Sequence, residues 1–151
     1  MSSSEDVIMV IKSLLVSQRF AVLATDDQEQ PYLFLMAFAA TADLKKIVLV
    51  TERETQKYAH LKSNRRVALL IDDRENRGAD TQEAIVVSVL GEAEEVEEGK
   101  ANQLRDLYLE RHPYLEEFAQ SPSCAIMQVQ VSSYRVVRKF QEVVEWCPDP
   151  K

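Results

Sequence analysis

The N-terminal segment has apolar positions at helical spacing. Ser2 and Glu5 are spaced as a capping box, which is a signal for the start of a helix. Apolar side chains then recur at intervals of three and four and form one stripe: Val7, Ile8, Ile11, Leu14 and Leu15. The pattern predicts a helix over about residues 4–17.

Short apolar segments rich in β-favouring residues follow, separated by polar turns. Residues 19–25 and 32–40 flank the turn Asp26-Asp27-Gln28-Glu29-Gln30, which indicates a strand–turn–strand hairpin. Further strands are expected at residues 44–50, 66–71 and 85–96. Gly91 lies inside the last of these and indicates a β-bulge, because glycine within a strand often marks one.

Helices are expected between these strands. Thr51-Glu52-Arg53-Glu54 has capping-box spacing and predicts a short helix over residues 53–63. Apolar positions at helical spacing predict another helix over about 98–111, and Pro113 starts a further short helix. Asp72 through Gln82 is expected to form a long polar loop.

Two strands complete the predicted chain. Apolar and polar side chains alternate over residues 125–132, the period of a sheet with one buried face, and a second strand runs from Tyr134 to Trp146. So many successive strands suit an antiparallel barrel rather than a doubly wound α/β sheet. The expected fold is mainly β, with six to seven antiparallel strands and three to four helices. No repeat or linker divides residues 1–151, so we expect one domain, with the barrel over about 19–146.

Composition and charge narrow the function classes. The chain has 151 residues, of which 46% are hydrophobic, enough for one domain with a sizeable core. A net charge of −7 argues against nucleic-acid binding, which needs a basic stripe. No apolar run reaches the roughly 18 residues of a membrane helix, so no membrane partner is expected. Two cysteines and an acidic N-terminal segment indicate a cytoplasmic protein.

The side chains offer little hydrolytic or metal-binding chemistry. His60 and His112 are the only histidines, and both are expected to be surface residues without a catalytic role. Cys124 is expected to be a small core residue. The chain has no paired-cysteine motif, two-histidine helix or calcium loop, and the acidic residues 92–98 are expected to be a solvated face. We therefore assign no catalytic side chain and no metal site.

The segment Thr51-Glu52-Arg53-Glu54-Thr55-Gln56-Lys57 combines hydroxyls and cations where a strand runs into a helix start. Unpaired amides at the N-terminus of a helix attract phosphate, and a nearby lysine and hydroxyl donors strengthen that attraction. The alternative is an ordinary capped surface helix, since capping boxes are common. Spacing alone favours that alternative.

Several segments over residues 19–146 follow one another in the same order, and at a similar spacing, as the characteristic segments of a known protein family. They are Phe20-Ala21-Val22-Leu23-Ala24-Thr25 with its turn and Pro31, Ile47-Val48-Leu49-Val50-Thr51, Thr55-Gln56-Lys57, Leu61 to Leu69, and Val87 to Ala93 with Gly91-Glu92-Ala93. In this order they resemble the flavin-binding split-barrel family related to pyridoxamine 5′-phosphate oxidase. The resemblance implies an FMN-binding split barrel with FMN at a homodimer interface.

The resemblance also implies which residues hold the phosphate of the flavin. Thr55 and Lys57 match the positions that bind it. Gln56 stands where the family often has arginine, which removes a bidentate phosphate partner. Arg53 is the candidate that supplies the missing charge from another side of the turn.

Further residues are implied around the flavin ring. Val50 and Thr51 would line the ribityl chain or the ring. The second strand would run beneath the isoalloxazine, through Leu35, Met36 and Ala37. Trp146 of the partner subunit would cover the ring, with a hydrophobic cap on the barrel as the alternative.

Three functions follow as hypotheses. The first is an FMN-dependent oxidoreductase acting on a small-molecule substrate, because the flavin itself carries the redox chemistry. In this hypothesis the polar loop 72–82 could act as a lid. The second is a non-catalytic module of the same fold that binds flavin, deazaflavin or haem. The third is a dimeric interaction protein without a cofactor.

Overall fold

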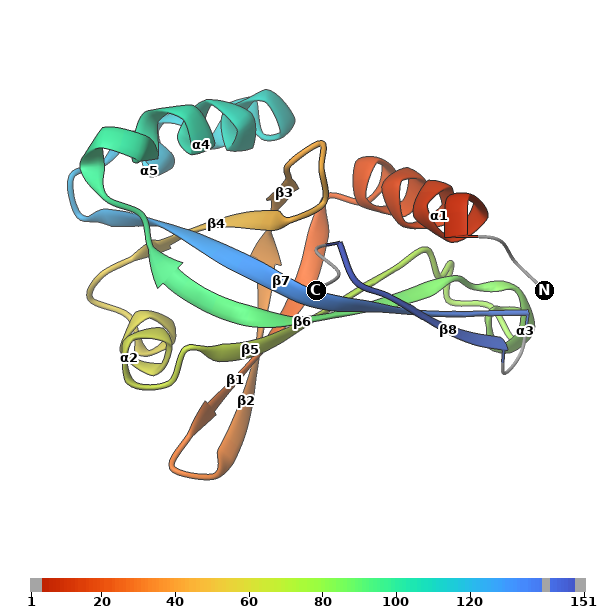
Figure 1. Ribbon diagram of the computed structural model, residues 1–151. Helices are drawn as coiled ribbons and strands as arrows, with labels where there is room; N and C mark the ends of the chain where they lie inside the picture. Colours follow the sequence, from red (N-terminus) through yellow and green to blue (C-terminus); the bar gives the residue numbers. More distant parts are fainter. Residues whose placement is uncertain (1–3, 140–141, 149–151) are drawn as a thin grey trace.

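The computed structural model describes residues 4–139 and 142–148. An antiparallel sheet forms its centre, with strand order β2-β1-β5-β6-β7-β4-β3 and β8 paired to β7. The strands are β1 (Phe20–Asp27), β2 (Gln30–Ala37), β3 (Ala39–Ala40), β4 (Lys46–Glu52), β5 (Arg66–Asp72), β6 (Val86–Glu95), β7 (Cys124–Arg138) and β8 (Glu142–Trp146). The sheet curls into a half-barrel (Figure 1), which confirms the expected split-barrel fold.

The helices cover different parts of this sheet. They are α1 (Ser4–Ser17), α2 (Gln56–Ser63), α3 (Asp80–Glu83), α4 (Glu98–Arg111) and α5 (Glu116–Gln120), with a 3₁₀ turn η1 (Pro113–Leu115). Figure 1 shows α4 and α5 together above β4, and α2 and α3 near opposite ends of the sheet. Two short elements were not predicted from the sequence as separate elements, the two-residue strand β3 and the four-residue helix α3. None of the helices in the described ranges is long and apolar enough to cross a membrane.

Strand β4 is apolar on both faces because it separates two cores. Ile47 and Leu49 belong to the main core inside the half-barrel. Val48 and Val50 belong to a second core beneath α4 and α5. A strand covered on both sides reads as a continuous apolar run rather than an alternating one.

Helix α1 closes the main core through its predicted apolar stripe. The residues buried are Val7, Ile11, Leu14 and Leu15. Arg111 at the end of α4 fixes the other end of α1, since its guanidinium donates to the carbonyl oxygens of Leu15 and Gln18, each at 2.8 Å. One carbonyl of the last turn of α1, which a helix cannot satisfy internally, and that of the residue directly after the helix therefore have a charged partner.

Gly91 lies at the bulge that the sequence predicted. The register between β6 and β7 shifts between Leu90 and Gly91. A Cβ atom at position 91 would collide with the carbonyl oxygen of Gln130 and contact Val129. Glycine is needed here because β7 approaches too closely for any side chain.

The structure corrects two predicted boundaries. Residues 125–138 belong to one strand, β7, where two were expected with a break before Tyr134; the chain turns after Arg138 and returns as β8. Helix α2 begins at Gln56 rather than at Arg53, because β4 continues to Glu52 and a turn follows.

The two histidines are the third correction, because neither is a surface residue. His60 is 3% exposed and His112 is fully buried. His112 directly follows Arg111 and His60 is two positions before Lys62, so local polarity gave the wrong expectation. Cys124 is buried, as predicted.

Candidate functional site

Thr55 fixes the shape of the turn between β4 and α2. Its hydroxyl oxygen accepts a hydrogen bond from the backbone N–H of Tyr58 at 3.3 Å and donates to the carbonyl oxygen of Glu52 at 2.7 Å. Thr51 Oγ1 lies 3.3 Å from Thr55 Oγ1. Thr55 is thus the N-cap residue of α2, four positions after the threonine whose spacing indicated a cap.

The start of α2 presents donors that have no partner in the described part of the chain. The backbone N–H groups of Gln56 and Lys57 donate no hydrogen bond to another described residue, as expected in the first turn of a helix. Lys57 Nζ lies 5.9 Å from the centroid of the Phe34 ring. Among the described residues Lys57 forms no ion pair. This geometry suits an anion.

Arg53 is engaged on another side of the turn. Its guanidinium donates to Glu95 Oε2 at 2.7 Å and to the carbonyl oxygen of Pro122 at 2.8 Å. Tyr58 Oη donates to the other Glu95 oxygen at 2.6 Å. Burial raises the pKa of Glu95, but the hydrogen bonds from Tyr58 and Arg53 outweigh it and hold that pKa below its ordinary value. The charge of Arg53 is therefore neutralised by Glu95, a partner that sequence reasoning missed.

Strand β2 presents alternate residues to opposite sides. Leu33 and Leu35 are 70% and 71% exposed, whereas Met36 is buried in the main core. Phe34, which the sequence did not single out, is the β2 residue beside Lys57. Strand β2 pairs only with β1 among the described strands, so its second edge has backbone groups without a strand partner.

The remaining predicted residues are partly brought together. Val50 and Thr51 are buried at the end of β4, directly before the turn, and Ala37 is half-buried at the end of β2. Trp146 is not near them in the same chain. Thr51 pairs with Ala125 on β7 and Trp146 pairs with Tyr134, nine positions further along (134 − 125 = 9).

Trp146 packs inside its own chain. Its ring stacks on Tyr134 with a centroid separation of 5.9 Å and an interplanar angle of 26°. It is half-buried against the main core. This arrangement agrees with the hydrophobic-cap alternative, and a role over a partner's ligand stays a prediction.

His60 connects α2 to the β1–β2 hairpin. Its Nδ1 lies 3.0 Å from Thr25 Oγ1, and its Nε2 lies 3.6 Å from Asp27 Oδ2. Its ring contacts those of Tyr32 and Phe34 at centroid distances of 4.6 and 5.9 Å. The contacts of His60 with β1 and β2 join residues far apart in the sequence and leave no local pattern. The adjacent apolar residue Leu61 is the one local signal that could have indicated burial.

His112 has a structural position between α4 and the end of β2. Its Nε2 lies 2.7 Å from the carbonyl oxygen of Phe38, and its Nδ1 lies 3.4 Å from Tyr114 Oη. Burial, helped by the nearby charges of Arg111 and Arg19, lowers the pKa of His112 despite the hydrogen bond to Phe38. Its burial therefore favours the neutral form of the ring.

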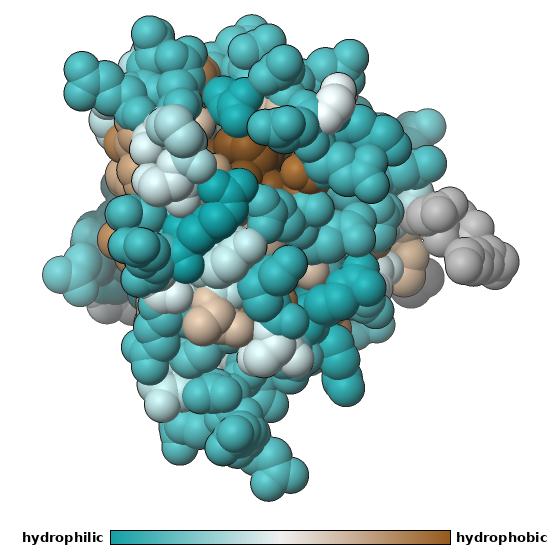
Figure 2. All heavy atoms as spheres, turned by 90° about the vertical axis from the view of Figure 1, so that its left-hand side faces the viewer, coloured by the Kyte–Doolittle hydropathy of each residue, from teal (hydrophilic) through white to brown (hydrophobic). Residues whose placement is uncertain are grey.

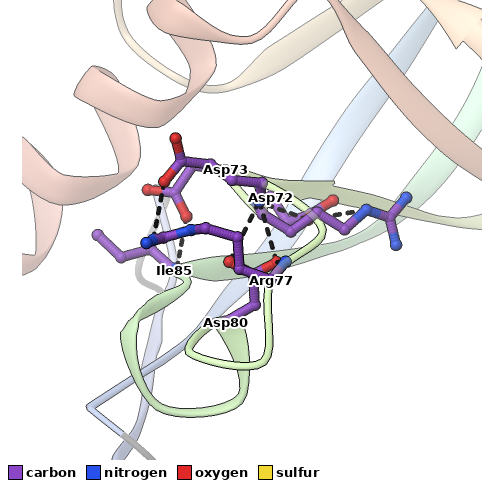
Figure 3. Close-up of polar contacts among 7 residues, drawn as sticks. Asp72, Asp73, Arg77, Asp80 and Ile85 are labelled. Atoms are coloured by element: carbon purple, nitrogen blue, oxygen red, sulfur yellow. Dashed lines mark hydrogen bonds and ion pairs between the residues drawn. The ribbon is translucent and has the colours of Figure 1, made fainter.

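The polar segment after β5 is closed by its own hydrogen bonds (Figure 3). Asp80 accepts from the backbone N–H groups of Glu75 and Arg77, and Asp73 accepts from that of Ile85 at 2.7 Å. Figure 1 places α3, which lies in this segment, at the end of the sheet away from α2. The segment therefore does not cover the turn before α2 in its own chain. No group of metal-binding side chains occurs within the described ranges.

Comparisons with known proteins identify the family and the fold. The family model described as pyridoxamine 5′-phosphate oxidase matches residues 10–138. No curated protein matches the chain.

Solved structures with the same fold are related only distantly in sequence. General stress protein 26 from Bacillus anthracis has a TM-score of 0.71 and 17% identity, over 93% of this chain and 98% of that one. A heme-binding protein from Mycobacterium smegmatis has a TM-score of 0.80 and 15% identity, over 91% of this chain and 56% of that one. ChuZ from Campylobacter jejuni has a TM-score of 0.81 and 12% identity, over 97% and 61%. The chain thus spans about three-fifths of the last two proteins.

The family match covers most of the chain, including β1 to β7 and the turn before α2. On this basis the chain belongs to the pyridoxamine 5′-phosphate oxidase family.

Proposed function

We propose that the protein is a homodimeric, FMN-binding oxidoreductase that acts on a small-molecule substrate. The observation that carries this proposal is the open start of α2, where among the described residues Lys57 has no ion-pair partner and the N–H groups of Gln56 and Lys57 have no hydrogen-bond acceptor. A phosphate ester fits such a start, because unpaired amides and a lysine both favour a dianion.

The donor set at this turn fits the phosphate of FMN. Lys57 and the two amides would hold it, and Thr55 would join them by turning its hydroxyl proton from the carbonyl oxygen of Glu52 to the phosphate, while Arg53 stays bound to Glu95. The exposed side chain of Gln56 would add one amide donor. FMN bound here would supply hydride and electron transfer, and the protein would bind and orient it.

A second copy of the chain is needed to enclose a flavin ring. Leu33 and Leu35 are exposed, and the strand pairing places Val22 and Ala24 of β1 opposite them. An apolar sheet face of this kind favours burial against a partner. Trp146 on β8 pairs with Tyr134, nine positions along β7 from the residue that pairs with Thr51 (134 − 125 = 9), so the Trp146 that covers a ring beside that turn would come from the partner subunit.

A titration with FMN tests the proposal. We expect the folded protein to bind FMN and quench its fluorescence, and Lys57→Ala to weaken binding at least about tenfold, because a charged hydrogen bond contributes about 1.5–3 kcal/mol. Lys62→Ala on the same helix is the matched control and should retain affinity. Folded protein without FMN affinity would refute the proposal. An equal effect of both substitutions would refute the assignment of Lys57.

The oligomeric state is a separate measurement. Light scattering after size exclusion should give the mass of a dimer, and Leu35→Lys should shift the protein toward monomer and weaken FMN binding together. A monomeric wild-type protein that binds FMN normally would contradict the shared site. Steady reduction of bound FMN by a nicotinamide cofactor, with reoxidation by an added acceptor, distinguishes an enzyme from a storage module.

A non-catalytic module that binds haem or a deazaflavin is the second candidate. The heme-binding protein from M. smegmatis has the same fold and supports it. Haem iron is often held by histidine, but both His60 and His112 are buried and hydrogen-bonded. A Soret band on addition of hemin, with no FMN uptake, would favour this candidate.

A further inference from the structure

An open cavity of about 470 Å³ lies between α4, the loop after α5 and the end of β6. Figure 2 views the side of the molecule that carries α2, α4 and α5, and shows a recessed hydrophobic area in its upper half. The cavity has an apolar floor formed by Val96, Ala101, Cys124 and Ile126. Its size is within the range of pockets that bind small molecules. It is a different surface from the open side of Lys57, which does not line it.

Helix α4 presents charges of opposite sign to this cavity. Glu98, Ala101 and Arg105 line it and are spaced i, i+3 and i+7, which places them on one helix face. The face is therefore acidic at the start of α4, apolar in its middle and basic near its end. Seven residues of α-helix separate the two charged positions by about 10 Å.

The charges at the two ends are not neutralised by described partners. Arg105 donates to the carbonyl oxygen of Ala119 at 3.0 Å and to Asn102 Oδ1 at 2.7 Å, and both acceptors are neutral. Glu97 and Glu98 form no ion pair with a described residue. Arg53 and Glu95, which also line the cavity, neutralise each other. A positive charge held in place thus remains at one end and two negative charges at the other.

We propose that this cavity binds a small zwitterion with an apolar middle, of the size of a dipeptide with apolar side chains. The carboxylate would pair with Arg105, the ammonium group with Glu97 or Glu98, and the apolar side chains would lie on the floor. A dipeptide separates its two charges by about 7 Å, which the flexible side chains of Arg105 and Glu98 can bridge. A free amino acid carries both charges on one carbon and cannot reach both ends.

Calorimetry with leucyl-leucine as the probe tests this site. We expect saturable binding with a dissociation constant below about 1 mM. Leucyl-leucine amide lacks the carboxylate and N-acetyl-leucyl-leucine lacks the ammonium group, so each should bind at least about tenfold more weakly. Free leucine should also bind more weakly. Folded wild-type protein that binds none of these compounds would overturn the proposal.

Protein variants assign the two ends. Arg105→Gln should weaken binding of leucyl-leucine at least about tenfold but leave the weak binding of its amide unchanged. The Glu97→Gln/Glu98→Gln variant should weaken binding of leucyl-leucine to a similar extent but leave the weak binding of N-acetyl-leucyl-leucine unchanged. Glu110→Gln/Glu117→Gln removes equal charge elsewhere on α4 and α5 and should have no effect. If a variant weakened binding of leucyl-leucine and of the derivative without the matching charge equally, the proposed charge pairing would be contradicted.

Cys124 provides a second readout that does not depend on calorimetry. It lies on the floor of the cavity, whereas Cys147 is exposed outside it. In a Cys147→Ser protein, leucyl-leucine should slow labelling of Cys124 by a thiol reagent, and its amide should not at the same concentration. Unchanged labelling at saturating leucyl-leucine would place the ligand elsewhere and overturn the assignment.

Discussion

The Nδ1 atom of His60 lies 3.0 Å from the hydroxyl oxygen of Thr25, and both side chains are buried. The contact joins α2 to β1 across 35 residues of sequence. Phe34 contacts both the His60 ring and the Lys57 ammonium group. The residues that hold α2 on the sheet are therefore continuous with those at the proposed phosphate site.

Breaking the contact between His60 and Thr25 should destabilise the protein. Thr25→Val leaves a ring nitrogen of a buried histidine without its partner, and a buried unsatisfied polar group costs about 1–3 kcal/mol. Urea unfolding measures the change. The His60→Leu variant and the double variant complete a cycle, in which the double variant should cost less than the sum of the single ones. Additive losses would show that the two groups are not coupled.

The ion pair of Arg53 and Glu95 should contribute more than the exposed pair of Arg65 and Glu94. Glu95 is partly buried and also accepts from Tyr58, whereas both members of the other pair are largely exposed. Exposed pairs contribute about 0–1 kcal/mol. We expect Arg53→Gln to lower the free energy of unfolding by about 1 kcal/mol or more, since it leaves the Glu95 charge without its cation. Arg65→Gln, measured in the same urea titration, should change it by less than half as much, and the reverse order would contradict this interpretation.

The sequence predicts the fold better than it predicts these contacts. The stripe in α1 and the alternation in β7 are local periodicities, which can be recognised within a single segment of sequence. The partner of Arg53 lies 42 residues away, and the partner of His60 lies 35 residues away. No local pattern encodes such pairs, so polarity alone suggested free cations and exposed histidines.

The N-cap illustrates the same limit at short range. Thr51 and Thr55 both precede residues that favour a helix, and spacing indicated the first. The pairing of β4 with β7 extends from Lys46 to Glu52, which keeps Thr51 in the sheet. Tertiary pairing therefore decided between two local signals of similar strength, and it placed the cap beside Lys57.

Stability should fall as the pH is lowered through the range where His112 would become charged. Burial lowers the pKa of His112 from its ordinary value of 6.5. As the pH falls below about 6.5 the unfolded chain binds a proton at this position and the folded chain does not. The free energy of unfolding therefore decreases by up to about 1.4 kcal/mol for each pH unit. The loss ends at the lower pKa of the folded state.

Urea unfolding between pH 7.5 and 5.0 measures this dependence. His112→Gln should be less stable at pH 7.5 but should lose less stability on acidification than the wild type. His60 is present in both proteins, so the difference between their slopes reports His112. The carboxyl groups of Asp43 and Glu95, whose pKa values are lowered, titrate below this range. Identical slopes would contradict the assignment to His112.

Two glycine-to-alanine substitutions should have opposite signs. Gly91→Ala places a Cβ against the carbonyl oxygen of Gln130, which belongs to the backbone of β7 and cannot move without breaking the sheet register. Overpacking of this kind costs about 1–3 kcal/mol. Gly99 lies in the first turn of α4 with nothing within 4 Å of the added atom, so Gly99→Ala should stabilise the protein by up to about 1 kcal/mol through helix propensity. Thermal unfolding of both variants gives the comparison. Because the chemical change is identical, opposite shifts in Tm must come from the local structure around each glycine. An unchanged Tm for Gly91→Ala would show that β6 and β7 do not approach as closely as the bulge requires.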